Sequence, residues 1–521
     1  MLKKIARFPT YGMLIGILPF LILWNNNKTQ IYTRDVVLSF LLTLAFVVAS
    51  WALFLLITHS AARASLASAL FFLLFFSFGH VYNLVQNKVF LGVSIGFVKL
   101  LAAYLVLAIV FTLLMIRVKK IPGDVTLWLN AILDVLILFN LFQIIQFELI
   151  HSRQAAAADA ENPRASASAT RASSAALPDI YYIILDSYSR QDVLKGVMNY
   201  DNSEFIQALR DRGFYVADCA NSNYDGTVAS VTSSLNYSYL TQSATLSNIE
   251  EKDLSLELVN NQIRADLAQR GYQFVTSKGF SSANDIPNSD IYLNYLTDTG
   301  IPDTVAQAQF TRMYSETTLL RIPFELHNMN PLRFSFLPDW LFMSDDQDSA
   351  IGYDSFWYNQ TKYVFDSLER FPSRDGNFFI YAHINAPHGP YVFDANGNFR
   401  YTYDSDENLP YYTDAIDWLD KRVPKLIDAL IADSKVPPII ILQGDHGAHV
   451  LTSGLNKNKI LSAYYFPGNA KSDLYPTITP VNTFRLVLRD YFGRQIDLLP
   501  DTVYAKITND YEPIPSSCNA P

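Results

Sequence analysis

Five apolar segments dominate the first 150 residues, and each has about the length of a helix that crosses a membrane. They span about Ile5–Trp24, Val36–Thr58, Leu66–Val85, Phe97–Ile116 and Val125–Leu149. About 20 apolar residues cross a bilayer as a helix, and only helices and closed barrels satisfy all their backbone groups there. We therefore predict an N-terminal α-helical transmembrane bundle, residues 1–150, with about five spans.

The first segment has a second interpretation, because Arg7 and Pro19 interrupt it. A cleaved signal peptide would also place an apolar stretch near the N-terminus. However, no small-residue cleavage site follows Trp24, and further apolar segments come after it. A spanning helix is therefore the favoured interpretation.

Basic residues around the segments indicate on which side the chain begins. Seven lie on one side of the predicted spans, namely Lys3, Lys4, Arg7, Arg63, Arg117, Lys119 and Lys120, and three on the other, namely Lys28, Arg34 and Lys88. Loops rich in Lys and Arg favour the cytoplasmic side. With a cytoplasmic N-terminus and an odd number of spans, everything after Leu149 lies outside the cytoplasmic membrane.

The fifth segment is unusually polar, since it contains Asn130, Asp134, Asn140 and Gln143. Polar groups within a span face the interior of the helix bundle. They predict hydrogen bonds between helices, with a role in substrate handling as the alternative.

Residues 151–177 separate this bundle from the rest of the chain. They are rich in Ala and Ser with scattered charges, which is typical of a linker, so we expect a separate domain over residues 178–521. The chain has a net charge of -9 and no basic cluster, which argues against nucleic-acid binding.

Three apolar stretches of the outer domain end in residues that can bind metals. Asp179–Asp186, Phe378–His383 and Pro438–Gly447 each contain a run of β-forming residues that ends in Asp or His. Such runs are typical of strands buried on both faces of a parallel sheet. Helical and further strand patterns occur at Ser203–Gly213, Leu258–Gly271, Tyr272–Ser277, Tyr412–Asp433 and Leu461–Phe466. The alternation predicts an α/β domain with a mostly parallel central sheet covered by helices.

The polar residues at these strand ends are Asp186, His383, Asp445 and His446. Open α/β sheets bind ligands at the carboxyl ends of their strands, and carboxylates and imidazoles suit divalent metals. The alternative for Asp445 and His446 is an ordinary turn after a strand. The aromatic stretch Gly300–Ala350 is irregular, and we place it in loops over the site.

Thr227 is the candidate nucleophile. It follows Gly226 and begins a run of small and hydroxyl residues, which predicts a tight entry into a helix. Backbone N–H groups at a helix start can bind an anion. A hydroxyl becomes a nucleophile when a metal lowers its pKa or a base takes its proton. The alternative is that Thr227 caps the helix.

Four motifs occur in a fixed order along the outer domain. They are Asp186, Thr227-x-x-Ser230, His383-Ile-Asn-Ala-Pro-His388-Gly-Pro and Gly444-Asp-His-Gly447. Their order resembles the alkaline phosphatase superfamily, and more narrowly its sulfatase-like branch, which includes lipoteichoic acid synthases and lipid A phosphoethanolamine transferases. Those proteins also carry about five N-terminal spans before an extracytoplasmic catalytic domain. The resemblance therefore implies an alkaline-phosphatase-like fold for the outer domain.

The resemblance implies that one divalent metal ion binds to Asp186, Thr227, Asp445 and His446. An oxygen and nitrogen ligand set favours zinc or manganese, with magnesium or calcium as alternatives. The transferases commonly have Glu where this chain has Asp186, although other branches of the superfamily use Asp there.

The resemblance also assigns catalytic roles to Thr227, His383 and His388. Thr227 would be the nucleophile, and the two histidines would contact the substrate phosphoryl group or a second metal. His449 is a weaker candidate ligand. Lys457 and Lys459 could hold a phosphate, although solvated surface lysines are the simpler interpretation.

The nucleophile motif of the sulfatases is absent. Those enzymes convert a Cys or Ser within Cys/Ser-x-Pro-x-Arg to formylglycine, whereas this chain reads Thr227-Val-Ala-Ser-Val, with neither Pro nor Arg. Threonine cannot give the same aldehyde. We therefore predict little hydrolysis of sulfate esters.

We predict a membrane-anchored, metal-dependent transferase. It would move a phosphoryl-linked group, such as phosphoglycerol or phosphoethanolamine, from a lipid donor to an envelope glycan or lipid through a threonine-linked intermediate. It would lie in the bacterial cytoplasmic (inner) membrane, with its catalytic domain facing the periplasm or the cell exterior.

The alternatives are a sulfatase-like hydrolase or phosphodiesterase, with water as the acceptor, and a non-catalytic membrane scaffold. The sequence leaves open the oligomeric state and whether Cys219 and Cys518 form a disulfide.

Overall fold

The structure of the protein is a computed structural model. It describes residues 8–518 except for 29–30, 32, 86–88, 91–92, 95, 119–121, 162–176, 241–253, 281–283, 301–304, 324–352, 401–407, 451, 469–472 and 507–510. The chain forms two compact units, one from residues 1–156 and 304–344 and the other from residues 157–303 and 345–521. The predicted boundaries after residues 150 and 177 therefore stay predictions.

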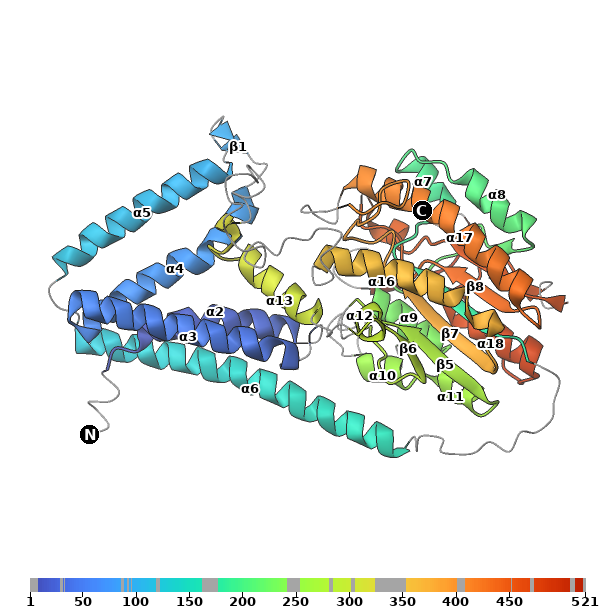
Figure 1. Ribbon diagram of the computed structural model, residues 1–521, viewed down its shortest axis with the longest axis horizontal. Helices are drawn as coiled ribbons and strands as arrows, with labels where there is room; N and C mark the ends of the chain where they lie inside the picture. The colour runs from blue at the N-terminus through green and yellow to red at the C-terminus, as the bar shows by residue number, and fades with distance from the viewer. Residues whose placement is uncertain are drawn as a thin grey trace. The chain divides into compact units, whose positions relative to one another are not determined.

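The first unit is built from long apolar helices (Figure 1). They are α2 (Tyr11–Asn27), α3 (Thr33–Thr58), α4 (Ala61–Val85), α5 (Phe97–Arg117) and α6 (Gly123–Glu161), with the short strands β1 (Val89–Phe90) and β2 (Val93–Ser94) between α4 and α5. Four of these helices, α3 to α6, are long and apolar enough to cross a membrane. The remaining helix, α2, has 17 residues and contains Pro19, so the fifth span stays a prediction.

The topology rests on charges that are only partly described. Six of the ten basic residues used to orient the chain lie outside the described residues, namely Lys3, Lys4, Arg7, Lys88, Lys119 and Lys120. The cytoplasmic position of the N-terminus is therefore also a prediction.

A helix from the middle of the chain belongs to this first unit. It is α13 (Val305–Glu316), and Phe310 packs edge-on against Phe20 with ring centroids 5.2 Å apart. The Thr43 hydroxyl donates a hydrogen bond to the Tyr314 hydroxyl at 3.2 Å. The expectation that Gly300–Ala350 forms loops over the site is wrong for α13. Its aromatic residues are four positions apart and share one helix face. Residues 301–304 and 324–350 of that stretch lie outside the described residues.

The polar residues of the fifth segment mostly bond to other parts of the bundle. The Asn25 amide donates to the side-chain oxygens of Asn140 and Gln143 at 3.0 and 2.6 Å, and the Asn130 amide donates to the Phe8 carbonyl at 2.7 Å. The predicted hydrogen bonds between helices are confirmed for Asn140 and Gln143, whereas Asn130 bonds to the segment before α2. Asp134 is exposed on α6.

The second unit contains a seven-stranded sheet. Its strands are β3 (Ile180–Leu185), β4 (Tyr215–Val216), β5 (Tyr272–Ser277), β6 (Ile291–Leu293), β7 (Asn377–Ile384), β8 (Ile439–Gln443) and β9 (Ser462–Tyr465), in the order β4-β9-β8-β3-β7-β5-β6. All neighbours are parallel except that β9 runs antiparallel to β8 and β4. The predicted mostly parallel sheet is confirmed.

Helices cover both faces of this sheet (Figure 1). Those of one group, α9 (Thr227–Leu235), α11 (Gln262–Ala268) and α18 (Pro480–Phe492), share an apolar core with the Ile180, Tyr182 and Ile184 side chains of β3. The other group includes α8 (Ser203–Asp211), α16 (Tyr353–Leu368) and α17 (Leu409–Asp433). All six residues of β3 are buried, because a central strand of a parallel sheet is covered on both faces.

Shorter elements complete the unit. They are α7 (Gln191–Gly196), α10 (Ser255–Val259), α12 (Tyr295–Asp298), the 3-10 turns η3 (Phe371–Ser373) and η4 (Gly454–Lys457), and the hairpin of β10 (Thr502–Lys506) and β11 (Tyr511–Pro515). Cys219 and Cys518 form a disulfide with their Cα atoms 4.7 Å apart, which answers the question that the sequence left open. The disulfide fixes the end of the chain to the loop before α9.

A buried carboxyl on α17 gives a prediction about pH. Burial raises the pKa of Asp420 to about 8, although the hydrogen bond from the Tyr188 hydroxyl, 2.7 Å away, works in the opposite direction. The unfolded chain would release this proton near pH 4. Between about pH 4 and pH 8 the folded state alone keeps the proton, so the free energy of unfolding should fall as pH rises, by up to about 1.4 kcal/mol per pH unit.

We expect Asp420→Asn to reduce this pH dependence, because its amide oxygen still accepts the Tyr188 hydrogen bond but carries no ionisable proton. In full-length protein in detergent, the variant should unfold at a higher temperature than the wild type at pH 8 and at a similar temperature at pH 5. Parallel curves for the two proteins from pH 5 to pH 8 would contradict the prediction.

Candidate active site

Three neighbouring strands deliver their polar ends to one edge of the sheet. Ile184 of β3 pairs with His383 of β7 on one side and with Gln443 of β8 on the other. Asp186 and Asp445 follow within two residues. One ligand atom from each of Asp186, His383 and Asp445 lies within 4.8 Å of the others, and all three residues are buried. The predicted convergence of strand ends is therefore present.

His383 is held by hydrogen bonds on both ring nitrogens. Its Nε2 lies 3.0 Å from Asp186 Oδ2, and its Nδ1 lies 2.9 Å from the Tyr381 hydroxyl. The Ser277 hydroxyl also bonds to its backbone N–H and carbonyl, at 3.0 and 3.2 Å. Burial lowers the pKa of His383, but the hydrogen bond and charge of Asp186 outweigh it, so the pKa is raised.

Asp186 shows the reciprocal effect. Burial alone would raise the pKa of its carboxyl, yet the charges of His388, His383 and His446 and the His383 hydrogen bond hold it well below its usual range. Asp186 is therefore an ionised carboxylate inside the domain, as a metal ligand must be.

Asp445 has one satisfied oxygen and one that makes no hydrogen bond within the described residues. Its Oδ1 accepts from the backbone N–H groups of Ser187 and His446 at 3.0 and 2.9 Å. Its Oδ2 is buried without a hydrogen bond. A buried polar atom without a partner is costly, and such an atom beside other carboxylate and imidazole groups fits a bound cation.

His446 directs one nitrogen toward this group. Its Nδ1 lies 2.8 Å from the Gly447 carbonyl, which can only accept, so Nδ1 carries the proton. Its Nε2 lies 3.6 Å from both Asp186 Oδ1 and Asp445 Oδ2. A metal-binding histidine commonly donates its other N–H to a carbonyl in this way.

Gly444 allows β8 and the loop after β3 to approach each other. A Cβ atom at this position would lie 2.5 Å from the Tyr188 carbonyl oxygen, closer than side-chain atoms can come. The glycine before Asp445 therefore has a packing reason, and it lets the Asp445 and His446 pair reach Asp186.

Thr227 is the first residue of α9, and its hydroxyl faces this group. Its Oγ1 lies 3.2 Å from His446 Nε2. The N-cap residue is Gly226, and no side chain caps the helix. The alternative in which Thr227 caps α9 is therefore wrong. Gly226 occupies the cap position, and Thr227 is the first residue of the helix, with its hydroxyl in contact with His446.

The residues present fit a divalent metal. Asp186, Asp445 and His446 offer two carboxylates and an imidazole around an unsatisfied oxygen, and Thr227 adds a hydroxyl at the edge of the group. Hard and borderline ligands of this kind suit zinc, manganese or magnesium. His383 belongs to the same three-residue group as the two aspartates, although the sequence predicted a substrate contact for it.

His388 and His449 lie beside His446, and both are more exposed than it. The ring centroids of His388 and His446 are 6.3 Å apart, and those of His446 and His449 are 5.0 Å apart. His449 is partly exposed to solvent. Its remaining burial, together with the charges of His446, His388 and Lys457, lowers its pKa to about 4. A small pocket beside them is lined by Ser187, Pro387, His388, Gly389, Tyr391, Tyr412 and His449.

The two lysines that could hold a phosphate lie in different surroundings. Lys457 acts electrostatically on His449, whereas Lys459 lies near Arg190 and Asp192. Burial lowers the pKa of Lys459, with the Asp192 charge opposing it. Their role as phosphate ligands stays a prediction. Of the two, Lys457 is the one whose charge acts on a histidine of the site.

Sequence reasoning missed four residues at this edge. They are Ser187, Ser277, Tyr381, which bonds to His383, and the buried Lys278, whose Nζ lies 3.7 Å from Asp285 Oδ2. Tyr381 precedes His383 by two positions and so shares its face of the strand, which is a signal visible in the sequence. The others depend on neighbouring strands and loops.

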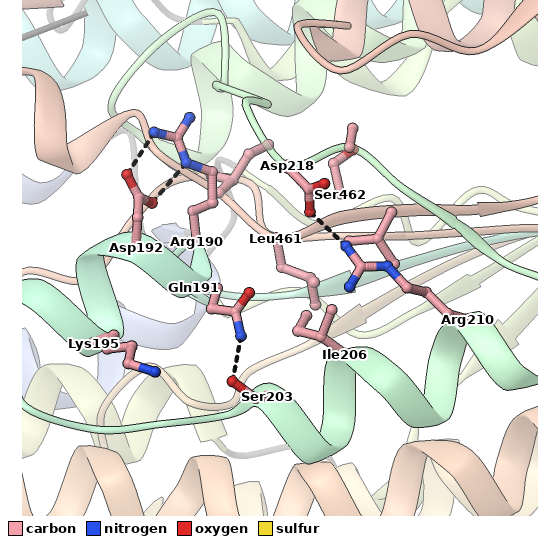
Figure 2. A pocket seen from close by; sticks show the side chains of 13 residues that line it. Arg190, Gln191, Asp192, Lys195, Ser203, Ile206, Arg210, Asp218, Leu461 and Ser462 are labelled. Carbon is pink, nitrogen blue, oxygen red and sulfur yellow. Dashed lines mark hydrogen bonds and ion pairs between the residues drawn. The ribbon is translucent and has the colours of Figure 1, made fainter. Parts of the chain in front are cut away.

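A larger pocket lies beside the loop after β3, away from these residues (Figure 2). Its lining is Arg190, Gln191, Asp192, Lys195, Ser203, Ile206, Arg210, Val216, Ala217, Asp218, Ile460, Leu461 and Ser462. Figure 2 shows Arg190 paired with Asp192 and Arg210 with Asp218, both at 2.7 Å, and Lys195 pairs with Asp201 at 2.8 Å. Because each of these cations is already paired with a carboxylate, the pocket is a poor phosphate site. The candidate active site is therefore the group around Asp186 and Thr227.

Comparison with known proteins agrees with the fold and the motifs. A family model described as Sulfatase matches residues 178–486, which is more than half of the chain. The chain belongs to the sulfatase family. It is therefore an enzyme of the alkaline phosphatase superfamily, and the resemblance drawn from the four motifs is confirmed.

Similar solved structures include the C-terminal periplasmic domains of two proteins and one integral membrane protein. The C-terminal periplasmic domain of EcEptC from Escherichia coli, in complex with Zn, has 12% identity and a TM-score of 0.40, over 65% of this chain and 93% of that one. Lipooligosaccharide phosphoethanolamine transferase A (EptA), an integral membrane protein from Neisseria meningitidis, has 11% identity and a TM-score of 0.37, over 93% and 94%.

The C-terminal periplasmic domain of phosphoethanolamine transferase EptC from Campylobacter jejuni has 11% identity and a TM-score of 0.35, over 62% of this sulfatase-family chain and 92% of that one. No curated protein matches the chain. At these identities and TM-scores, the similar structures assign no substrate to this chain.

We expect Asp445→Asn to lower the amount of divalent metal bound to purified full-length protein at least about tenfold, because the buried Oδ2 would lose its charge. Elemental analysis after dialysis measures this. Asp218→Asn is the matched control, since it removes a carboxylate that pairs with Arg210, and it should bind as much metal as the wild type. Equal metal content in all three proteins would contradict the assignment.

Proposed function

We propose that this sulfatase-family protein is a membrane-anchored, metal-dependent transferase. It moves a phosphoryl-linked group, such as phosphoglycerol or phosphoethanolamine, from a lipid donor to an envelope glycan or lipid. The observation that carries the proposal is the Thr227 hydroxyl, which lies 3.2 Å from His446 at the edge of the buried Asp186 and Asp445 carboxylates. A hydroxyl in that position serves as a nucleophile toward an electrophilic centre that carries negative charge.

The nucleophile supports phosphoryl rather than sulfuryl chemistry. Thr227 carries an unmodified hydroxyl, and the Cys/Ser-x-Pro-x-Arg motif that gives formylglycine is absent. The backbone N–H groups of the first turn of α9, just after Thr227, are free of intrahelical partners and suit the oxygens of a phosphoryl group.

A divalent ion, held by Asp186, Asp445 and His446, would lower the pKa of the Thr227 hydroxyl and neutralise charge on the phosphoryl oxygens. His383 keeps Asp186 in place through its 3.0 Å hydrogen bond. His388 is half-buried and its ring lies beside that of His446, so its imidazole can give a proton to the departing oxygen.

The reaction then has two balanced steps. In the first, a bond forms between Thr227 Oγ1 and phosphorus as the bond from phosphorus to the lipid oxygen breaks. Thr227 releases its proton to solvent, and the lipid leaves as an alcohol with a proton from His388. In the second, a hydroxyl of the acceptor attacks the same phosphorus and gives its proton to His388, as the bond from phosphorus to Oγ1 breaks and Thr227 takes a proton from solvent. A hydrolase would use water in the second step.

One feature supports an acceptor at the outer surface of the cytoplasmic membrane over water. Four apolar helices exceed what an anchor alone requires, since one span would suffice. The Cys219–Cys518 disulfide fits a compartment more oxidising than the cytoplasm, which agrees with an outer domain in the periplasm or at the cell exterior. A non-catalytic scaffold is disfavoured because it has no reason to keep an unsatisfied carboxylate buried beside His446 and Thr227.

We expect Thr227→Ala to reduce transfer at least about a thousandfold, because no other group replaces the nucleophile, whereas Thr227→Ser should keep part of the activity. The assay incubates full-length protein with phosphatidylglycerol or phosphatidylethanolamine vesicles and follows diacylglycerol release by mass spectrometry. Ser233→Ala is the control, since this buried hydroxyl of α9 donates to the Ser230 carbonyl within the helix. Full activity of Thr227→Ala would exclude Thr227 as the nucleophile.

The acceptor can be identified in cells by comparing envelope lipids and glycans with and without the gene. A product that carries a phosphoryl-linked substituent, and that disappears in the Thr227→Ala strain, would establish transfer. Release of the free headgroup phosphate with no modified lipid or glycan would instead favour the hydrolase.

A further inference from the structure

The loop after β3, residues 186–190, contains a backbone conformation that is unusual for its residue type. Ser187 has a φ of +66°, in the left-handed region, where residues other than glycine are uncommon. Strained residues of this kind persist only when their surroundings hold them, and they cluster at functional sites. Ser187 directly follows the candidate metal ligand Asp186.

In this conformation Ser187 contacts carboxylates from two strands. Its backbone N–H donates to Asp445 Oδ1 at 3.0 Å, and its hydroxyl donates to Asp186 Oδ1 at 3.1 Å. One residue therefore joins the end of β3 to the end of β8. With φ in the ordinary negative range, the side chain and carbonyl of Ser187 would be turned relative to its N–H, so the bonds to Asp445, Asp186 and Tyr412 could not be made together.

A tyrosine from a distant helix holds this residue. Tyr412, in the first turn of α17, donates its hydroxyl to the Ser187 carbonyl at 2.9 Å and accepts from the Ser189 N–H at 3.3 Å. Its side chain is 1% exposed. A single hydroxyl thus bonds to the peptide groups on both sides of Tyr188.

We propose that Tyr412 is a positioning residue, which holds Ser187 in its left-handed conformation and thereby keeps the Asp186 and Asp445 carboxylates together as ligands of the divalent ion. This inference rests on the metal site of the proposed function. Tyr412 touches neither carboxylate within the described residues, so it acts through Ser187.

A purely structural role is the competing explanation, since a buried hydroxyl also satisfies buried backbone groups. The two explanations differ in what removal of the hydroxyl would change. Loss of a structural hydrogen bond lowers stability wherever it occurs. Loss of a positioning contact lowers the affinity of the metal site beyond any effect on stability.

The chain offers a matched control for this distinction. Tyr272, at the start of β5, donates its hydroxyl to the Pro178 carbonyl at 2.7 Å, and it is 5% exposed. It lies at the amino ends of β3 and β5, and so at the opposite edge of the sheet from Asp186. Tyr272→Phe therefore removes a similar hydrogen bond far from the metal ligands.

The experiment measures Zn²⁺ affinity of full-length, metal-depleted protein in detergent by competition with a chromophoric chelator, together with the unfolding temperature without metal. We expect Tyr412→Phe to weaken Zn²⁺ binding by about 10- to 100-fold, as for other groups that support metal ligands. Tyr272→Phe should leave the Zn²⁺ affinity unchanged. Without metal, the two variants should unfold at similar temperatures.

A double-mutant cycle with Ser187→Gly tests the route of the effect. Glycine adopts positive φ without strain, so it needs no tyrosine to hold it there. We expect Tyr412→Phe to cost less than about threefold in affinity in the Ser187→Gly background, because the two residues act as one unit.

Equal losses of affinity in both backgrounds, or Zn²⁺ affinity of Tyr412→Phe equal to that of Tyr272→Phe, would overturn the inference alone. A wild-type protein that binds no Zn²⁺ would overturn the proposed metal site and this inference together.

Discussion

The parallel pairing of β3 with β7 on one side and β8 on the other is the interaction on which the site depends. Because Ile184 is level with both His383 and Gln443, the three strands end within a residue or two of one another. Asp186 and Asp445 then follow at the same edge. A shift of one residue in either pairing would turn the strand's side chains to the opposite faces and separate the ligand atoms.

This arrangement is stable only if the buried charges are compensated. Two aspartates that approach each other inside a domain repel, and removal of each from water is costly. His383 provides one compensation through its hydrogen bond to Asp186, and backbone N–H groups provide another at Asp445 Oδ1. Among the residues that the structure describes, Asp445 Oδ2 has no hydrogen-bond partner, and this local cost is what a bound cation would remove. The oxygen whose burial is costly is thus the same oxygen that would bind the ion.

Much of this could be predicted from short-range patterns. The apolar runs that end at Asp186, His383 and Asp445 are buried strands, because a central parallel strand must be apolar on both faces. Thr227 begins a helix as predicted, since Gly226 and the small residues after it favour a tight turn. The family assignment followed from the order of these motifs and is confirmed by the match over residues 178–486.

The remainder could not be predicted, because it depends on contacts between residues far apart in the chain. Tyr412 reaches Ser187 from a helix more than 200 residues away, and no pattern in α17 distinguishes it from other buried aromatic residues. Cys219 and Cys518 are 299 residues apart, so their pairing required the fold. The error at α13 has a different origin. Its aromatic residues were taken for loop residues, although Phe310 and Tyr314 have helical spacing.

The central claim is that Asp186, Asp445 and His446 hold a divalent ion against the Thr227 hydroxyl. Anomalous X-ray scattering from crystals of the full-length protein, recorded on both sides of the zinc absorption edge, tests it most directly. The account predicts one strong peak about 2.0–2.2 Å from a carboxylate oxygen of each aspartate and from His446 Nε2, with Thr227 Oγ1 as the fourth contact. A peak that contacts other residues, or no peak in zinc-soaked crystals, would contradict it.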